Sequence, residues 1–311
     1  MRRLRDPSDL ADAPGAVAAI GNFDGVHLGH QAVLDATRIV AVRMGAPLGV
    51  LTFEPHPRQH FAPDAPPFRL TSANAKAHRL EKLGVQVVFE MPFDAALAAL
   101  SAEAFVADVL VGRLRLAHAV VGADFRFGRS RAGSAEGLRA MGAPLGLGVT
   151  VVPLLDLGQG VVSSTAIRQA LSAGRPRDAA AMLGHWHRIE GEVVRGDRRG
   201  RTLGYPTANI SIAGLHPPRF GIYAVGVDVL DGPHRGRYSG VASIGVRPMF
   251  GGSEPNCETF LFDFAGDLYG ATLSVALVDY LRPEMTFDGL PALVAQMDAD
   301  SARAREALAH A

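Results

Sequence analysis

The chain has 311 residues, which is enough for two domains that each bury a core. Lys and Arg total 31, as do Asp and Glu, so the charge balance argues against broad binding to nucleic acid or to a membrane surface. The single cysteine, Cys257, excludes internal disulfides and fits a reducing, cytoplasmic setting. The basic N-terminus lacks a signal-peptide core, and no apolar run is long enough to predict a membrane span.

The first half alternates short apolar runs with helical patterns. The strand candidates are residues 16–20, 48–53, 85–89, 117–121 and 149–154, and the helical stretches are 28–44, 74–83 and 102–113. This alternation predicts an α/β domain with a doubly wound parallel sheet. Because ligands of such sheets bind beyond the carboxyl ends of the strands, we expect segments 21–30, 54–58 and 122–128 to lie at the site.

Residues 21–30, GNFDGVHLGH, connect the first predicted strand to the first predicted helix. Free N–H groups and the dipole at a helix start favour anions, and Gly29 leaves room for a nucleotide. His27 and His30 are three residues apart, so both imidazoles can face one phosphate chain. A His-x-x-His pair could instead bind zinc, although no Cys or acidic cluster accompanies this one. The predicted triphosphate loop comprises Gly21, Asn22, Phe23, Asp24, His27 and His30.

Two later segments of the first half are further anion or nucleotide candidates. Asp124 follows a predicted strand and could accept a hydrogen bond from a ribose or base, or it could belong to an ordinary strand-end loop. Ser163, Ser164 and Thr165 begin a predicted helix whose N–H groups they can cap. Arg168 lies four residues after Ser164 and can reach a phosphate, but a plain N-cap with a surface arginine is an equal interpretation.

After Gly184 the pattern changes to alternating polar and apolar residues, in segments 188–194, 221–229, 240–244, 258–264 and 272–278. Gly and Pro turns separate these segments, which predicts antiparallel β-structure, a small barrel. A helix over about residues 286–310 ends the chain. We therefore predict two domains, residues 1–184 and 185–311.

In the second half, the extended segment GYPTANI places Thr207 and Asn209 on one side, with oxygen ligands that suit Mg²⁺. Upstream, a basic loop containing Gly196, Gly200 and Arg201 could cover phosphates. A polar strand after a hairpin is the alternative interpretation.

Glu258 is the other candidate in this half. A period of two puts it on one face with Phe260, Phe262 and Phe264, which we expect to point inward. A carboxylate on such a face is costly unless it is paired or used, so Glu258 is a candidate general base. The alternatives are that this face meets solvent near its end, or that Glu258 pairs with an arginine such as Arg247.

In their order and spacing, these motifs resemble those of bacterial bifunctional riboflavin kinase/FMN adenylyltransferases, also called FAD synthetases. The resemblance covers nearly the whole chain, through GNFDGVHLGH, LTFEPHPR, VVGADFRFG, SSTAIR, GDRRGRTLGYPTANI, GVRPMFGG and ETFLFDFAGDLYG. It implies two ATP-dependent reactions. The second domain would phosphorylate riboflavin to FMN, and the first would transfer AMP from ATP to FMN, giving FAD and pyrophosphate.

The resemblance also implies roles for individual residues. Glu258 would take the proton of the ribityl hydroxyl, Thr207 and Asn209 would hold Mg²⁺ and phosphates, and His27 and His30 would stabilise the triphosphate. Asn22, Asp124, Ser164 and Arg168 would complete the nucleotide site. Flavin contacts are expected at Pro55, His56, Pro57, Arg58 and Arg247.

One departure from the family pattern is Met249, where the family usually has threonine after Arg-Pro. A thioether cannot donate a hydrogen bond, which puts in doubt a loop contact near the kinase site.

Two rival functions are an adenylyltransferase for another substrate, with a β-domain that only binds, and a flavin-sensing regulator that has lost its chemistry. Thr207, Asn209 and Glu258 argue against the first, and the intact His27, His30 and Glu258 argue against the second. We expect riboflavin, FMN and ATP as small-molecule partners, with neither nucleic acid nor membrane, and nothing in the sequence sets the oligomeric state.

Overall fold

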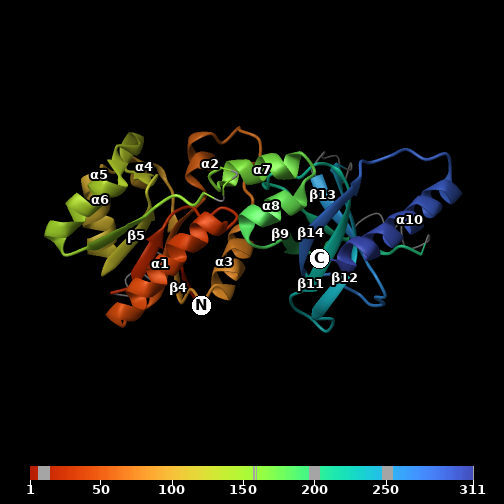
Figure 1. Ribbon diagram of the computed structural model, residues 1–311, viewed down its shortest axis with the longest axis horizontal. Coiled ribbons are helices and arrows are strands. Elements are labelled where there is room, and N and C mark those ends of the chain that lie inside the picture. Colours follow the sequence, from red (N-terminus) through yellow and green to blue (C-terminus); the bar gives the residue numbers. More distant parts are fainter. Residues whose placement is uncertain (6–14, 157, 159, 196–203, 247–254, 311) are drawn as a thin grey trace. The chain divides into compact units, whose positions relative to one another are not determined.

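The computed structural model describes residues 1–5, 15–156, 158, 160–195, 204–246 and 255–310 (Figure 1). It divides into two compact units, Met1–Ala65 with Lys76–Val162, and Pro66–Ala75 with Ser163–Ala311. Each unit has buried apolar clusters of its own. Within the described ranges, no helix has the length and hydropathy needed to cross a membrane.

A sheet of six parallel strands, in the order β1-β4-β3-β2-β5-β8, forms the centre of the first unit. The predicted doubly wound sheet is therefore confirmed. The strand order reverses between β2 and β5, so the carboxyl ends of these two neighbours form the switch point where such sheets bind ligands. The strands are β1 (Arg2–Leu4), β2 (Val17–Ile20), β3 (Leu48–Glu54), β4 (Val87–Pro92), β5 (His118–Gly122) and β8 (Gly148–Val152), with a separate hairpin of β6 (Arg126–Phe127) and β7 (Gly133–Ser134).

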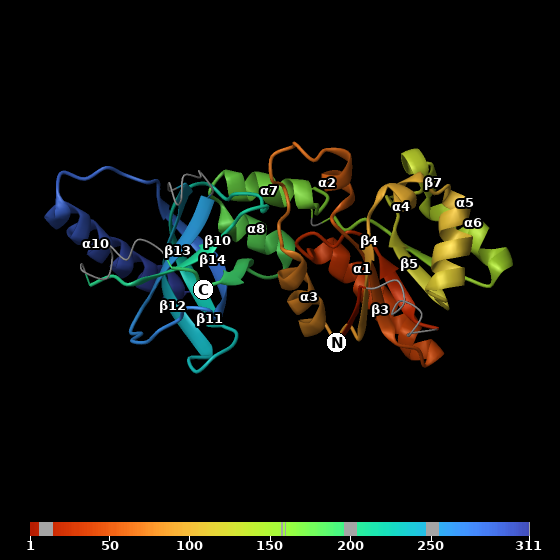
Figure 2. The ribbon, with the colours of Figure 1, turned by 180° about the vertical axis from the view of Figure 1, so that it is seen from behind.

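Helices cover both faces of this sheet, which is why its central strands are largely apolar (Figures 1 and 2). On one face, Leu34 of α1 and Leu80 of α3 pack with Val50 of β3. On the other, Leu110 and Leu138 pack with Phe89 of β4. The helices of this part of the chain are α1 (Leu28–Met44), α2 (Pro57–Phe61), α3 (Ala73–Lys82), α4 (Ala95–Ala99), α5 (Ala102–Ala104), η2 (Phe105–Arg113), η3 (Arg129–Arg131), α6 (Ala135–Gly142) and η4 (Ala143–Leu145).

The single helix predicted over residues 102–113 is wrong in one respect. Its first turn, α5, is α-helical, but η2 is a π-helix, and the N–H of Leu114 donates to the carbonyl of Val109 five residues earlier. The apolar pattern identifies a buried helical segment but does not distinguish the two helical repeats.

The second unit contains an antiparallel sheet in the order β10-β13-β12-β11-β14-β9. The sheet curls, and its two edges meet where the N–H of Val194 donates to the carbonyl of Asn209. The helix α10 covers the outer face, where Ala304 packs with Phe262 and Ala224. The elements are α7 (Ser164–Ser172), α8 (Pro176–Leu183), β9 (His187–Glu192), β10 (Thr207–Ser211), β11 (Gly221–Val229), β12 (Gly236–Val246), β13 (Pro255–Leu261), β14 (Thr272–Arg282) and α10 (Leu290–Ala309).

Candidate functional site

The loop between β2 and α1 has a tightly specified backbone. Phe23, Gly25 and Val26 have φ values of 52°, 83° and 45°, and a left-handed conformation is unusual for a β-branched residue such as Val26. Two hydrogen bonds hold the turn: the N–H of Val26 donates to the carbonyl of Phe23, and the Gln31 side-chain amide donates to the carbonyl of Val26. Strained residues of this kind persist at ligand-binding loops because their surroundings determine them.

Both predicted histidines lie together at the start of α1. His27 is the N-cap residue, and its Nδ1 accepts a hydrogen bond from the N–H of His30 at 3.3 Å. The two rings stack with their centroids 3.7 Å apart, and the ring of Phe23 lies 5.0 Å from that of His30. The helix start thus presents two imidazoles beside its first N–H groups.

His30 is held in its neutral form. Burial lowers its pKa well below 6.5, and the nearby His27 and Lys76 lower it further. Its Nδ1 is buried and has no hydrogen-bond partner among the described residues. A neutral imidazole with an unpartnered ring nitrogen can take part in a hydrogen bond to a ligand without bringing a second cation next to Lys76.

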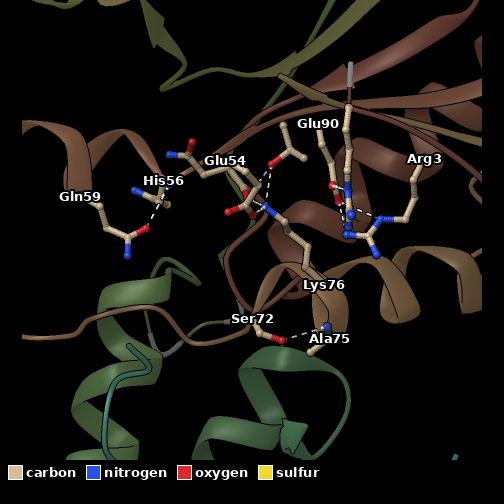
Figure 3. Close-up of polar contacts among 11 residues, drawn as sticks. Arg3, Glu54, His56, Gln59, Ser72, Ala75, Lys76 and Glu90 are labelled. Carbon is tan, nitrogen blue, oxygen red and sulfur yellow. Dashed lines mark hydrogen bonds and ion pairs between the residues drawn. The ribbon is translucent and has the colours of Figure 1, made fainter. Parts of the chain in front are cut away.

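Lys76, on α3, was missed by the sequence analysis (Figure 3). Its side chain is only 3% exposed, and Nζ lies 2.7 Å from Oε1 of Glu54. Nζ also donates to Oγ1 of Thr52 and to the carbonyl of Asn22. The available signal was its helical spacing: Lys76 is four residues before the buried Leu80, so both lie on the buried face of the helix.

The predicted flavin segment follows β3. Nδ1 of His56 accepts from the N–H of Arg58 and so caps α2, and Oε1 of Gln59 accepts from the N–H of His56 (Figure 3). This is a structural role for His56. Pro55 follows a cis peptide bond, and Pro57 is the first residue of α2.

An aromatic cluster adjoins this segment and was also missed. The ring of Phe61 is 68% exposed and lies edge-on to Phe93, at a centroid distance of 5.8 Å. His60 contacts the same phenylalanine at 5.5 Å. Exposed aromatic surface next to Arg58 suits a planar, anionic ligand.

Asp124 is exposed in the loop that follows β5, the neighbour of β2. Of the two aromatics beside it, Phe127 belongs to the core, and Phe125 stacks on it at 5.4 Å.

The predicted helix start at residues 163–168 is present in the second unit. Ser163 is the N-cap of α7 and accepts from the N–H of Ala166, so the predicted cap is confirmed, and Ser164 and Thr165 open the helix. Nε of Arg168 donates to the carbonyl of Phe68, and the guanidinium lies 5.4 Å from the centroid of the Phe68 ring. Gly196, Gly200, Arg201, Arg247 and Met249 lie outside the described residues.

A second polar cluster lies on β10 and β13. In their antiparallel register Asn209 is directly opposite Glu258, and Thr207 is opposite Phe260. Nδ2 of Asn256 donates to Oδ1 of Asn209 and to Oε1 of Glu258, both at 3.4 Å. Because their neighbours Ala208 and Ile210 belong to the core, Thr207 and Asn209 share the opposite face, as predicted.

The expectation that Glu258 points into the barrel is wrong. Cys257 and Leu261 belong to the barrel core, and Thr259 is also fully buried, so Glu258 and Phe260 lie on the outer face. Phe260 and Phe262 join the cluster beneath α10 instead. The period of two groups Glu258, Phe260 and Phe262 correctly, but both faces of β13 carry apolar residues. The expected place of Phe264 on this face is wrong, because β13 ends at Leu261 and Phe264 packs against the barrel core. Burial on the inner face raises the pKa of the Cys257 thiol to about 12.

Among the described residues, no group of three or more His, Cys, Asp and Glu side chains is arranged to hold a metal ion. The oxygen atoms of Thr207 and Asn209 nevertheless fit Mg²⁺, which binds through few protein ligands and takes the rest from water and phosphate.

Two family models match this chain, one in each half. The FAD synthetase family model matches residues 9–166, and the riboflavin kinase family model matches residues 183–308. The bifunctional riboflavin kinase/FMN adenylyltransferase of Escherichia coli K12 is 41% identical over 98% of this chain and 97% of its own. The chain belongs to this family.

Other members of the bifunctional riboflavin kinase/FMN adenylyltransferase family are similarly close. The Bacillus subtilis enzyme is 36% identical over 93% of this chain and 91% of its own. A crystal structure titled as a macrolide-efflux protein from Streptococcus pneumoniae is 31% identical and superposes with a TM-score of 0.85, covering 98% of this chain and 99% of that one.

Proposed function

We propose that the two reactions of the family take place at the two polar clusters, one in each unit. The chain is an ATP-dependent transferase that phosphorylates riboflavin to FMN, releasing ADP, and then transfers AMP from a second ATP to FMN, releasing pyrophosphate. Both transfers need positioning and charge neutralisation more than covalent help from the protein.

Glu258 is the general base of the kinase reaction and accepts the proton of the ribityl hydroxyl as it attacks the γ-phosphate of ATP. The observation that carries this assignment is the register that sets Glu258 opposite Asn209 on one face. Asn256, which contacts both side chains, holds the carboxylate toward Asn209. Thr207 and Asn209 would hold Mg²⁺, which when bound neutralises phosphate charge.

The adenylyl transfer takes place at the start of α1. The stacked His27 and His30 stabilise the triphosphate, together with the N–H groups of the helix start. In-line attack by the FMN phosphate on the α-phosphate of ATP then requires only that the two phosphates be oriented toward each other. The remaining nucleotide contacts are proposed at Gly21, Asn22, Phe23, Asp24, Asp124, Ser163, Ser164, Thr165 and Arg168, and in the kinase domain at Gly196, Gly200 and Arg201.

The flavin of the adenylyl transfer is proposed to bind along Pro55–Arg58, where the exposed Phe61 offers a face for the isoalloxazine ring. Arg247 is kept as a flavin contact of the kinase. We also retain the functional domains 1–184 and 185–311, which the start of the riboflavin kinase match at residue 183 supports. The single, buried cysteine supports a cytoplasmic location.

The test is to incubate the purified chain with riboflavin, ATP and Mg²⁺ and to separate the flavins by chromatography. FMN should appear first and FAD after it, with ADP and pyrophosphate released in step. Formation of neither flavin would overturn the proposal. FAD formed from added FMN, without FMN from riboflavin, would overturn the kinase assignment alone.

A further inference from the structure

We infer that Lys76 is a positioning residue for adenylyl transfer, whose buried ammonium group holds the backbone of Asn22 in the loop that carries His27 and His30. The inference rests on the adenylyltransferase function proposed above.

The surroundings of Lys76 use all three of its N–H donors. At 3% exposure the ammonium must be paired, and it contacts Glu54 Oε1 at 2.7 Å, Thr52 Oγ1 at 2.9 Å and the Asn22 carbonyl at 3.3 Å. Glu54 and Thr52 come from the carboxyl end of β3, and Asn22 comes from the loop after β2. One side chain of α3 thus ties the loop to the neighbouring strand (Figure 3).

The Asn22 carbonyl is the loop atom that Lys76 contacts. It accepts from Lys76 and also from Oγ1 of Thr52, at 3.1 Å. Because a trans peptide group is planar, holding this carbonyl toward Lys76 turns the N–H of Phe23 in the opposite direction. Phe23 itself has a φ of 52°, and its ring lies 5.0 Å from the ring of His30. The orientation of one peptide group therefore reaches one of the two proposed triphosphate-binding histidines through a single intervening residue.

Stability alone does not account for a lysine at this position. Replacing a buried ion pair with apolar residues of similar volume is often neutral or stabilising. The same helix face already buries Leu80 in the core. A lysine here is explained better by the need for a donor that reaches a loop carbonyl while Glu54 balances its charge.

The experiment compares full-length variants in FMN-dependent FAD formation, with riboflavin phosphorylation as a readout in the same molecule. Lys76→Met keeps the side-chain length and removes the donors, so kcat/KM for ATP should fall about 10- to 100-fold, the loss that misplacement of a binding group produces. The KM for riboflavin in the kinase reaction should stay within about twofold of wild type. Lys76→Arg, which keeps the charge and the donors, should recover most of the loss.

Leu80→Ala is the matched control, because it weakens the packing of the same helix in the core but leaves Lys76 and its contacts with Glu54, Thr52 and Asn22 in place. At a temperature well below its unfolding midpoint it should retain the wild-type kcat/KM for ATP. If Lys76→Met does not fold, the double variant Lys76→Met with Glu54→Gln removes both charges and is assayed in its place.

Wild-type kcat/KM for ATP in the folded Lys76→Met or double variant would overturn the inference, as would an equal loss in Leu80→Ala. If wild-type protein makes no FAD from FMN, the proposed function fails instead, and the two failures are thereby distinguished.

Discussion

Replacing Glu258 with glutamine should stop FMN formation while FAD formation from added FMN continues. Glutamine has nearly the same shape, and its Oε1 can still accept from Asn256, as the carboxylate does at 3.4 Å. The change removes only the capacity to accept a proton. Because Glu258 lies on the half-buried outer face of β13, we expect the free energy of unfolding to change by less than about 1 kcal/mol.

The effect on the reaction should be much larger than the effect on the fold. A positioned general base contributes about 10²- to 10⁴-fold, so kcat for riboflavin phosphorylation should fall by that factor. At about 1.36 kcal/mol for each factor of ten, the barrier rises by about 2.7–5.4 kcal/mol. The assay is steady-state formation of FMN, followed by chromatography, with FAD formation from FMN measured on the same preparation.

Glu190→Gln is the control for this prediction. Glu190 lies on β9 of the same sheet and accepts a hydrogen bond from Ser274, which glutamine can also accept, so both activities should remain near wild type. The reasoning would be refuted if Glu258→Gln formed FMN at the wild-type rate, or if both activities fell together in a folded protein.

Three further outcomes are expected. His27→Asn keeps a side-chain cap for α1 but removes the stacked imidazole, so FAD formation should fall about 10²- to 10³-fold with FMN formation unchanged, and a parallel loss of both would contradict separate sites. Excess EDTA should silence both reactions if Mg²⁺ neutralises the phosphates at each site, and persistence of either reaction would argue against that role. Burial first, and then His185 and His216, lowers the pKa of His187 to about 3, whereas an unfolded histidine titrates near 6.5. Below pH 6.5 the unfolded chain therefore binds a proton that the folded chain does not, and stability falls by about 1.4 kcal/mol per pH unit as the pH drops toward 3. His187→Gln should flatten this acid-side dependence in denaturant titrations, and an unchanged slope would show that His187 is not the group responsible.

Local patterns in the sequence were sufficient to predict much of the fold and part of the candidate site. The alternation of buried runs and helices predicted the parallel sheet, and the position of GNFDGVHLGH between strand and helix placed His27 and His30 at a helix start. The spacing of Thr207 and Asn209 predicted their common face. These features depend on residues close together in the chain, whose relations a strand or helix repeat determines.

Other features depended on contacts between distant segments. Side chains from the other strands fill the barrel, and α10 covers its outer face. These contacts decide which face of β13 points inward, so the sequence assigned the Phe260 face to the wrong side. The pairing of Asn209 with Glu258 is set by the register of two strands that are far apart in sequence. The inferred role of Lys76 depends on the packing of α3, which brings its ammonium group to Asn22 and Glu54. A periodic pattern reports which residues share a face, whereas what covers that face is decided only when the chain packs against itself.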